Sequence, residues 1–84
     1  MNQADSIRQF VNEHYTEPAR SRGVRQVQVR AGTVHADMKL KDRMPAVAGA
    51  LGATAFEVGY RVKCIARTGP HNGANLMFTF EIQS

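Results

Sequence analysis

Hydrophobic residues recur at helical spacing in the first part of the chain. The apolar positions of this stripe are Ile7, Phe10, Val11 and Tyr15. Their separation by three or four residues predicts an amphipathic helix over residues 4–15. Asp5 or Ser6 can cap its start, and Pro18 is expected to prevent its continuation. Residues 20–23 are polar and basic, so a loop is expected there.

The middle of the chain combines one strand pattern with two helix patterns. Residues 24–30 alternate valine with polar side chains, which predicts a short, half-buried strand. Apolar residues one turn apart predict a two-turn helix over residues 31–38, and Leu40 is expected to fill the corner that follows. Asp42 is a suitable N-cap for a further helix over residues 43–51. The expected inward side of that helix carries Val47, Ala48 and Leu51.

Alternation with a period of two residues dominates the last part of the chain. It is clearest over residues 76–82 and weaker over residues 61–67. The turn-forming residues 69–75 between them, with Asn72-Gly73 at the tip, predict a β-hairpin. On the first of these strands, one face is expected to carry Arg61, Lys63, Ile65 and Arg67. Residues 53–60 are ambiguous, and a short extra helical turn is one interpretation.

The length and the charge of the chain limit the number of domains and indicate the kind of partner. Eighty-four residues suffice for one domain, residues 1–84, with a single small core. The chain has no apolar run long enough to span a membrane and no visible secretory signal, so a cytoplasmic protein is expected. The formal net charge is +4, which favours a polyanionic partner. The basic residues concentrate in residues 18–43 and 61–67.

The order of these elements resembles that of the winged helix-turn-helix superfamily over nearly the whole chain. Residues 31–51 resemble the helix-turn-helix, with a short helix, a corner and a second helix, and the C-terminal hairpin resembles the wing. The resemblance implies an α+β fold with a three-helix core and a small antiparallel sheet. That sheet would combine the short strand with the hairpin.

The same resemblance implies a way of binding double-stranded DNA. The helix over residues 43–51 would lie in the major groove, and the turn over residues 67–75 would act as the wing. The expected DNA-binding residues are Lys39, Lys41, Arg43, Met44, Ala46, Gly49, Arg61, Lys63, Arg67, His71 and Asn72. Ala50 is expected outward as well. Arg43 is the best candidate for a base or phosphate contact, and the lysines beside the corner are expected on the DNA backbone.

Few residues suggest catalysis or metal binding. His14, His35, His71 and Cys64 show none of the ligand spacings of zinc sites. Cys64 is expected to be a buried, inert thiol, and the carboxylates are scattered along the chain. His35 is interpreted as a surface or half-buried histidine, with a phosphate contact as the alternative. We therefore expect no catalytic residue, no metal and no cofactor.

The sequence favours a non-enzymatic protein that binds double-stranded DNA. It would be a small regulator, or the targeting module of a defence or mobile-element system, nucleoid-associated in a prokaryote. The alternative is a winged-helix adaptor that binds a protein, for example a phage or host enzyme, without DNA. Binding of single-stranded RNA is a third option, for which only Tyr15 and Tyr60 offer aromatic rings. The sequence leaves open whether the first helix also mediates a homodimer.

Overall fold

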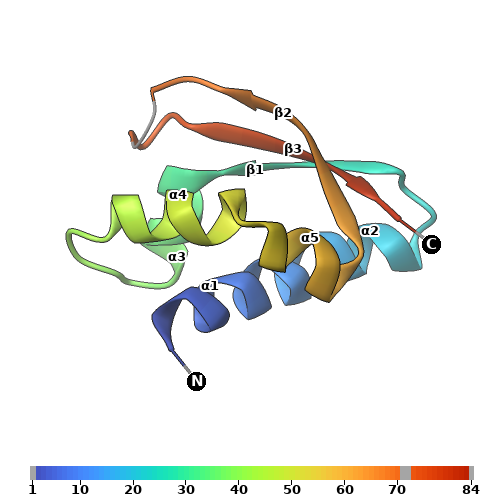
Figure 1. The fold of residues 1–84 in the computed structure, drawn as a ribbon, viewed down its shortest axis with the longest axis horizontal. Helices are drawn as coiled ribbons and strands as arrows, with labels where there is room; N and C mark the ends of the chain where they lie inside the picture. The colour runs from blue at the N-terminus through green and yellow to red at the C-terminus, as the bar shows by residue number, and fades with distance from the viewer. Residues whose placement is uncertain (1, 71–72, 84) are drawn as a thin grey trace.

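The protein is built of two layers, a three-stranded antiparallel sheet and the helices that cover one of its faces (Figure 1). This computed structural model describes residues 2–70 and 73–83. The strand order is β1-β3-β2, so the last strand of the chain lies in the centre of the sheet. The prediction of an α+β domain with a short strand and a C-terminal hairpin is confirmed at this level.

The N-terminal helical segment is longer than the sequence predicts. Its parts are α1 (Gln3–Val11), the π-helical turn η1 (Asn12–Thr16) and α2 (Glu17–Ser21). The cap is Asn2, whose side chain accepts a hydrogen bond from the Asp5 N–H at 2.8 Å, so the predicted caps Asp5 and Ser6 are wrong. The prediction that Pro18 ends the helix is also wrong. Pro18 falls in the first turn of α2, where a missing N–H is tolerated.

A strand and three helices lead to the hairpin. They are β1 (Gln26–Arg30), α3 (Ala31–Asp37), α4 (Met44–Gly52) and α5 (Thr54–Tyr60). The two predicted helices of the helix-turn-helix pattern are confirmed, and the ambiguous segment 53–60 is mostly helical. The predicted cap Asp42 is wrong, because this residue is left-handed with φ 54° and the N-cap position belongs to Arg43. No side chain makes a capping hydrogen bond there.

A β-bulge decides which side chains of the hairpin face outward. The two strands are β2 (Val62–Thr68) and β3 (Met77–Ile82). Lys63 pairs with Glu81 on the outer face, whereas Arg67 pairs with the buried Phe78 on the inner face. The register shifts by one residue at Ile65. Because side chains alternate along a strand, this extra residue transfers all later positions to the other face, and the prediction of one basic face is wrong.

The core lies between the inner face of the sheet and the helices, and aromatic rings form its centre. The ring of Phe80 packs edge-on against Phe56 at 5.0 Å and stacks on Phe78 at 5.7 Å, centroid to centroid. All three side chains are fully buried. The alternating residues of the last strand therefore face the core as the sequence predicts. The inward side predicted for α4 is confirmed too, since Val47, Ala48 and Leu51 are buried.

Candidate nucleic-acid interface

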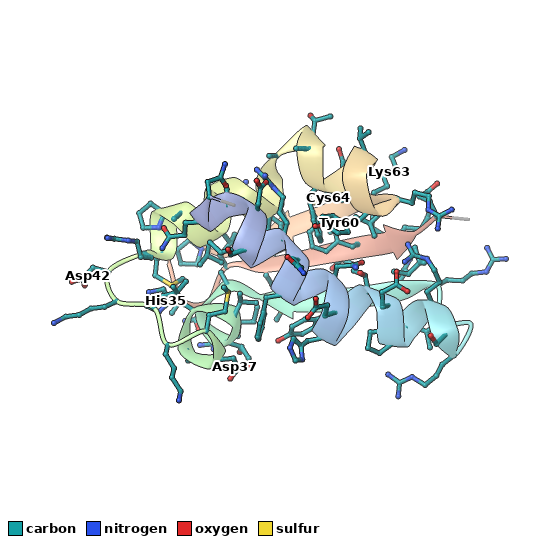
Figure 2. The ribbon with its side chains drawn as sticks, turned by 90° about the horizontal axis from the view of Figure 1, so that it is seen from below. His35, Asp37, Asp42, Tyr60, Lys63 and Cys64 are labelled. Atoms are coloured by element: carbon teal, nitrogen blue, oxygen red, sulfur yellow. The ribbon has the colours of Figure 1, made fainter. Side chains whose placement is uncertain are left out.

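The turn between α3 and α4, residues 38–43, is exposed and cationic. Lys39, Lys41 and Arg43 are exposed, and none of them forms an ion pair within the described part of the chain. Asp42 is the only carboxylate in this turn. Figure 2 shows the turn projecting at one end of the molecule, with Asp42 at its outer limit. The structure therefore brings together three of the predicted DNA-binding residues.

Backbone hydrogen bonds and left-handed residues define the shape of this turn. The Lys39 N–H donates to the Ala36 carbonyl at 3.0 Å, and the Leu40 N–H donates to the His35 carbonyl at 3.1 Å. Lys39 and Asp42 have φ of 56° and 54°, a conformation that costs an L-residue about 1–2 kcal/mol. The side chain of Leu40 packs against the core, as predicted. The cations thus project from a defined backbone.

His35 fastens the end of the turn to α3. Its Nε2 accepts a hydrogen bond from the Arg43 backbone N–H at 3.1 Å. Arg43 is the N-cap residue of α4, so this bond joins one helix to the start of the next. The sequence predicts His35 to be at the surface or half-buried, and the structure shows it half-buried. Its role as an acceptor escaped the sequence analysis, because the bond spans eight residues and depends on how the turn folds.

Replacing His35 by alanine is expected to lower the free energy of unfolding by about 1 kcal/mol, because the Arg43 N–H loses its acceptor. Urea denaturation of the variant measures this loss. His14→Ala is the matched control, since the His14 ring is exposed and lies tilted against that of Phe10, with 4.2 Å between the ring centroids. Equal stability of His35→Ala and the unmodified protein would show that the bond does not hold the turn.

The outward side of α4 presents almost no side chains. Its exposed positions are Pro45, Gly49 and Gly52. They are separated by three or four residues and therefore form one stripe along the helix. A duplex can come close to such a surface, but the stripe offers no side-chain donor or acceptor for base edges. The exposure predicted for Gly49 is confirmed.

Other residues predicted on the outward side of α4 are packed. Ala50 is only 2% exposed, so its predicted outward position is wrong. The reason is that α1 lies against this side of α4, where the Arg8 Nε donates to the Ala50 carbonyl at 3.0 Å. Met44 and Ala46 are half-buried against the core. Contact of either residue with DNA is therefore restricted to the part of its side chain that stays accessible.

The part of the hairpin turn just before β3, residues 74 and 75, is fastened to the start of α3. The Gly32 N–H donates to the Ala74 carbonyl at 3.0 Å. A Cβ on residue 32 would lie 2.6 Å from that oxygen, so this close approach requires glycine. The Arg30 guanidinium adds a hydrogen bond of 2.9 Å to the Asn75 side-chain oxygen. These contacts hold the turn end of the hairpin at the same end of the molecule as the cationic turn (Figure 1).

The basic residues of the second strand are not brought together. The Arg67 guanidinium lies over the Phe78 ring, 5.0 Å from its centroid, and close to Gly52. Arg61 precedes β2 at the other end of the strand, about 20 Å from Arg67 at the usual rise per residue. Lys63 points from the outer face. The predicted wing residues His71 and Asn72 lie outside the described residues.

The thiol and the carboxylates are poorly placed for nucleophilic catalysis or metal binding. Burial raises the pKa of Cys64, so this thiol stays protonated at neutral pH and is a poor nucleophile. Cys64 is half-buried rather than fully buried, and its backbone N–H donates to the Glu57 carboxylate at 2.9 Å. Across residues 2–70 and 73–83, no group of three His, Cys, Asp or Glu residues could hold a metal ion.

The two tyrosines do not form a stacking platform. Tyr15 and Tyr60 are half-buried and pack against the core. Burial raises the pKa of Tyr15, and the negative charge of Asp37 adds to this effect. The outer face of the sheet, where the structure describes it, carries polar, charged and small side chains and Met77, but no aromatic ring. It therefore lacks the rings on which single-stranded RNA is usually stacked.

Comparison with known proteins adds no relative. No family model, no curated protein and no solved structure matches this chain. Within the described residues, no helix is long and apolar enough to cross a membrane. The function must therefore be inferred from the site itself.

Proposed function

We propose that this protein is a small, non-enzymatic, winged-helix-like domain that binds double-stranded DNA. In this proposal α3, the turn and α4 form the helix-turn-helix, and the hairpin of β2 and β3 forms the wing. The element order and the strand order β1-β3-β2 are compatible with that fold. The cationic turn 38–43 carries the proposal, because its exposed cations, which form no ion pair with a described residue, project from a defined backbone at the end where the turn of the hairpin also lies.

The proposed contacts are mainly with phosphates. Lys39 and Lys41 would lie on the DNA backbone, and Arg43 is the side chain of the turn best able to reach a base edge or clamp a phosphate. The bare stripe of α4 would let the duplex approach closely. With so few polar side chains on α4, preference for a sequence would come from the shape and deformability of the DNA more than from base contacts.

A salt titration of duplex binding tests this proposal. Three phosphate contacts predict a slope of about −3 for the logarithm of the affinity against the logarithm of the salt concentration. Affinity should thus fall by about fortyfold between roughly 50 and 200 mM salt. Fluorescence anisotropy with a labelled duplex of mixed sequence measures both quantities. An affinity for duplex DNA that does not change over this range of salt concentration would contradict the proposal.

A protein-binding adaptor is the second candidate, favoured by two exposed aliphatic residues. Val58 of α5 is 73% exposed and Ile65 in the β-bulge is 43% exposed. Their chain neighbours Glu57 and Cys64 are joined by a hydrogen bond of 2.9 Å, which holds α5 against β2. Recovery of one stoichiometric protein partner that is lost in Val58→Asp, together with no duplex binding, would favour this function.

A further inference from the structure

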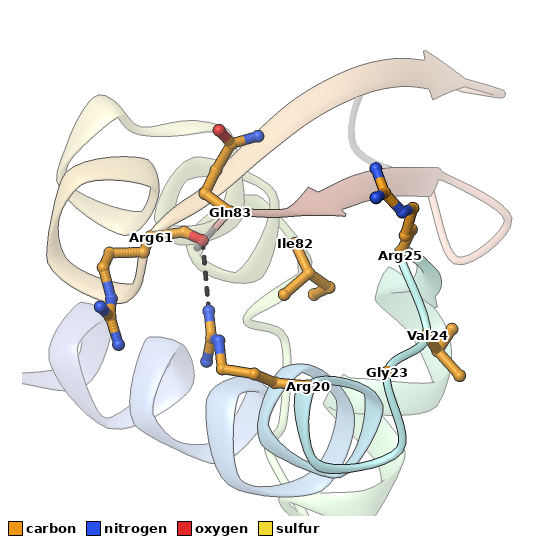
Figure 3. Close-up of a pocket in the computed structure, with 7 residues that line it drawn as sticks. All are labelled: Arg20, Gly23, Val24, Arg25, Arg61, Ile82 and Gln83. Carbon is orange, nitrogen blue, oxygen red and sulfur yellow. Dashed lines mark hydrogen bonds between the residues drawn. The ribbon is translucent and has the colours of Figure 1, made fainter.

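A cavity of about 240 Å³ is lined by residues of α2, of the loop after it, of the position before β2 and of the end of β3 (Figure 3). Figure 1 shows that these segments meet at the opposite end of the sheet from the cationic turn. The lining of the cavity includes the arginines Arg20, Arg25 and Arg61, with Ile82 and Gln83 from the C-terminal part of the chain. These arginines lie on three different segments, so no local pattern in the sequence groups them.

Arg20 forms a fixed wall of this cavity. Its Nη1 donates to Glu17 at 2.8 Å, and its Nη2 donates to the backbone carbonyls of Tyr60 and Arg61 at 2.9 and 3.2 Å. Its side chain is 22% exposed. The Nε is buried and has no hydrogen-bond acceptor among residues 2–70 and 73–83. The guanidinium is thus positioned in advance, with one donor that no described residue satisfies.

Arg25 and Arg61 supply mobile positive charge around the cavity. Both residues are exposed, and neither side chain makes a hydrogen bond or an ion pair with any residue that the structure describes. Figure 3 places their guanidinium groups on opposite sides of the cavity, with that of Arg61 turned away from Arg25. Exposed side chains change rotamer within nanoseconds, so either group can turn toward a bound anion.

The balance of charge at the cavity is positive. Glu17 is already paired with Arg20. Glu81, next to the cavity, accepts a hydrogen bond from the Gln83 side chain at 2.9 Å and lies opposite Lys63 in the sheet. Arg25 and Arg61 therefore have no carboxylate partner among the residues that the structure describes. Guanidinium groups match the geometry of phosphate oxygens, and a phosphomonoester carries close to two negative charges at neutral pH.

From this arrangement we infer that the cavity binds the phosphate group of a phosphomonoester. Its volume is below that of pockets that enclose a whole drug-sized ligand, so it takes the phosphate and a small attached fragment. The phosphate can belong to a small free molecule or to the 5′ end of a nucleic acid. The inference does not rest on the proposed function, since the cavity and the cationic turn share no residue.

Titration of the protein with inorganic phosphate at constant ionic strength, followed in ¹H–¹⁵N spectra, tests the inference. Saturable shifts are expected at the backbone amides of Gly23, Val24 and Gln83. Arg25→Ala should weaken binding about fivefold or more, because a charge-assisted contact is lost. Arg22→Ala is the matched control, because Arg22 carries the same charge in the same part of the chain but does not line the cavity. This variant should change the affinity for phosphate less than twofold.

Two further measurements identify the source of the phosphate and separate this inference from DNA binding. If a 5′-phosphorylated duplex binds more tightly than the same duplex without the phosphate, the cavity binds a nucleic-acid end. If both duplexes bind equally and the titration with inorganic phosphate saturates, the cavity binds the phosphate of a small molecule. Lys39→Ala with Lys41→Ala should leave the phosphate shifts unchanged. Shifts that do not saturate, or an equal loss in Arg22→Ala and Arg25→Ala, would overturn the inference.

Discussion

Replacing Lys39, Lys41 and Arg43 together by alanine is expected to weaken binding of duplex DNA about a hundredfold. Each exposed contact between a cation and a phosphate contributes about 1 kcal/mol, and the three contacts together correspond to about two powers of ten in the dissociation constant. The salt slope should fall toward zero in this variant, because each lost phosphate contact reduces it by about one. Anisotropy titrations of the variant at several salt concentrations measure both changes.

The matched control for this variant removes three exposed cations elsewhere. Arg22, Arg25 and Lys63 are exposed and lie away from the turn, so their replacement by alanine lowers the net charge by the same amount. Measured with a duplex that lacks 5′-phosphate groups, which the cavity lined by Arg25 would otherwise bind, the control should lose only a few-fold in affinity through the weaker long-range field. An equal loss in both variants would mean that the duplex senses the total charge and that the turn is not the binding site. Circular dichroism confirms that both variants remain folded.

Replacing Phe80 by alanine is expected to lower the free energy of unfolding by about 3–5 kcal/mol. Phe80 is fully buried on the central strand, between Val27 of β1 and Cys64 of β2 in the register of the sheet. The substitution also removes the packing of its ring against Phe56 and Phe78. A domain of this size is typically stable by only about 5–15 kcal/mol, so much of its stability would be lost.

Urea denaturation followed by far-ultraviolet circular dichroism measures this loss. Val58→Ala is the control for removal of an apolar side chain, because Val58 is 73% exposed and should change the stability by about 0.5 kcal/mol or less. A loss below about 1 kcal/mol in Phe80→Ala would contradict the packing of the three rings. If the variant is unfolded in water, Phe80→Leu, with a smaller expected loss of about 1–2 kcal/mol, gives a measurable transition.

The two basic ends of the molecule have different physical characters. At the turn 38–43 the cations are exposed and held on a defined backbone, which suits a long polyanion that passes over the surface. At the cavity Arg20 is fixed and largely buried, with two mobile arginines beside it, which suits a small anion that enters. The sheet separates the two ends, and the longest dimension of the molecule is 34 Å. Variants at one end can therefore test one site without altering the other.

Periodic patterns predicted most of the elements and much of the core. The alternation over residues 76–82 gave the central strand, with Phe78 and Phe80 facing inward. Helical spacing gave α1, α3 and α4, although the ends of α1 were misplaced. These predictions succeed because burial of apolar side chains selects the period of each element, and this selection is visible in the local sequence.

The features that the sequence did not predict depend on contacts between segments that are distant in sequence. Ala50 is buried because α1 packs against α4, and Arg67 faces inward because one residue is inserted at the bulge. Neither event changes the local apolar pattern. The left-handed turn, with His35 holding Arg43, and the cavity around Arg20 arise in the same way. The sequence by itself determined the elements, their order and the positive charge, whereas long-range packing decided which cations lie together, because a local pattern does not record its distant neighbours.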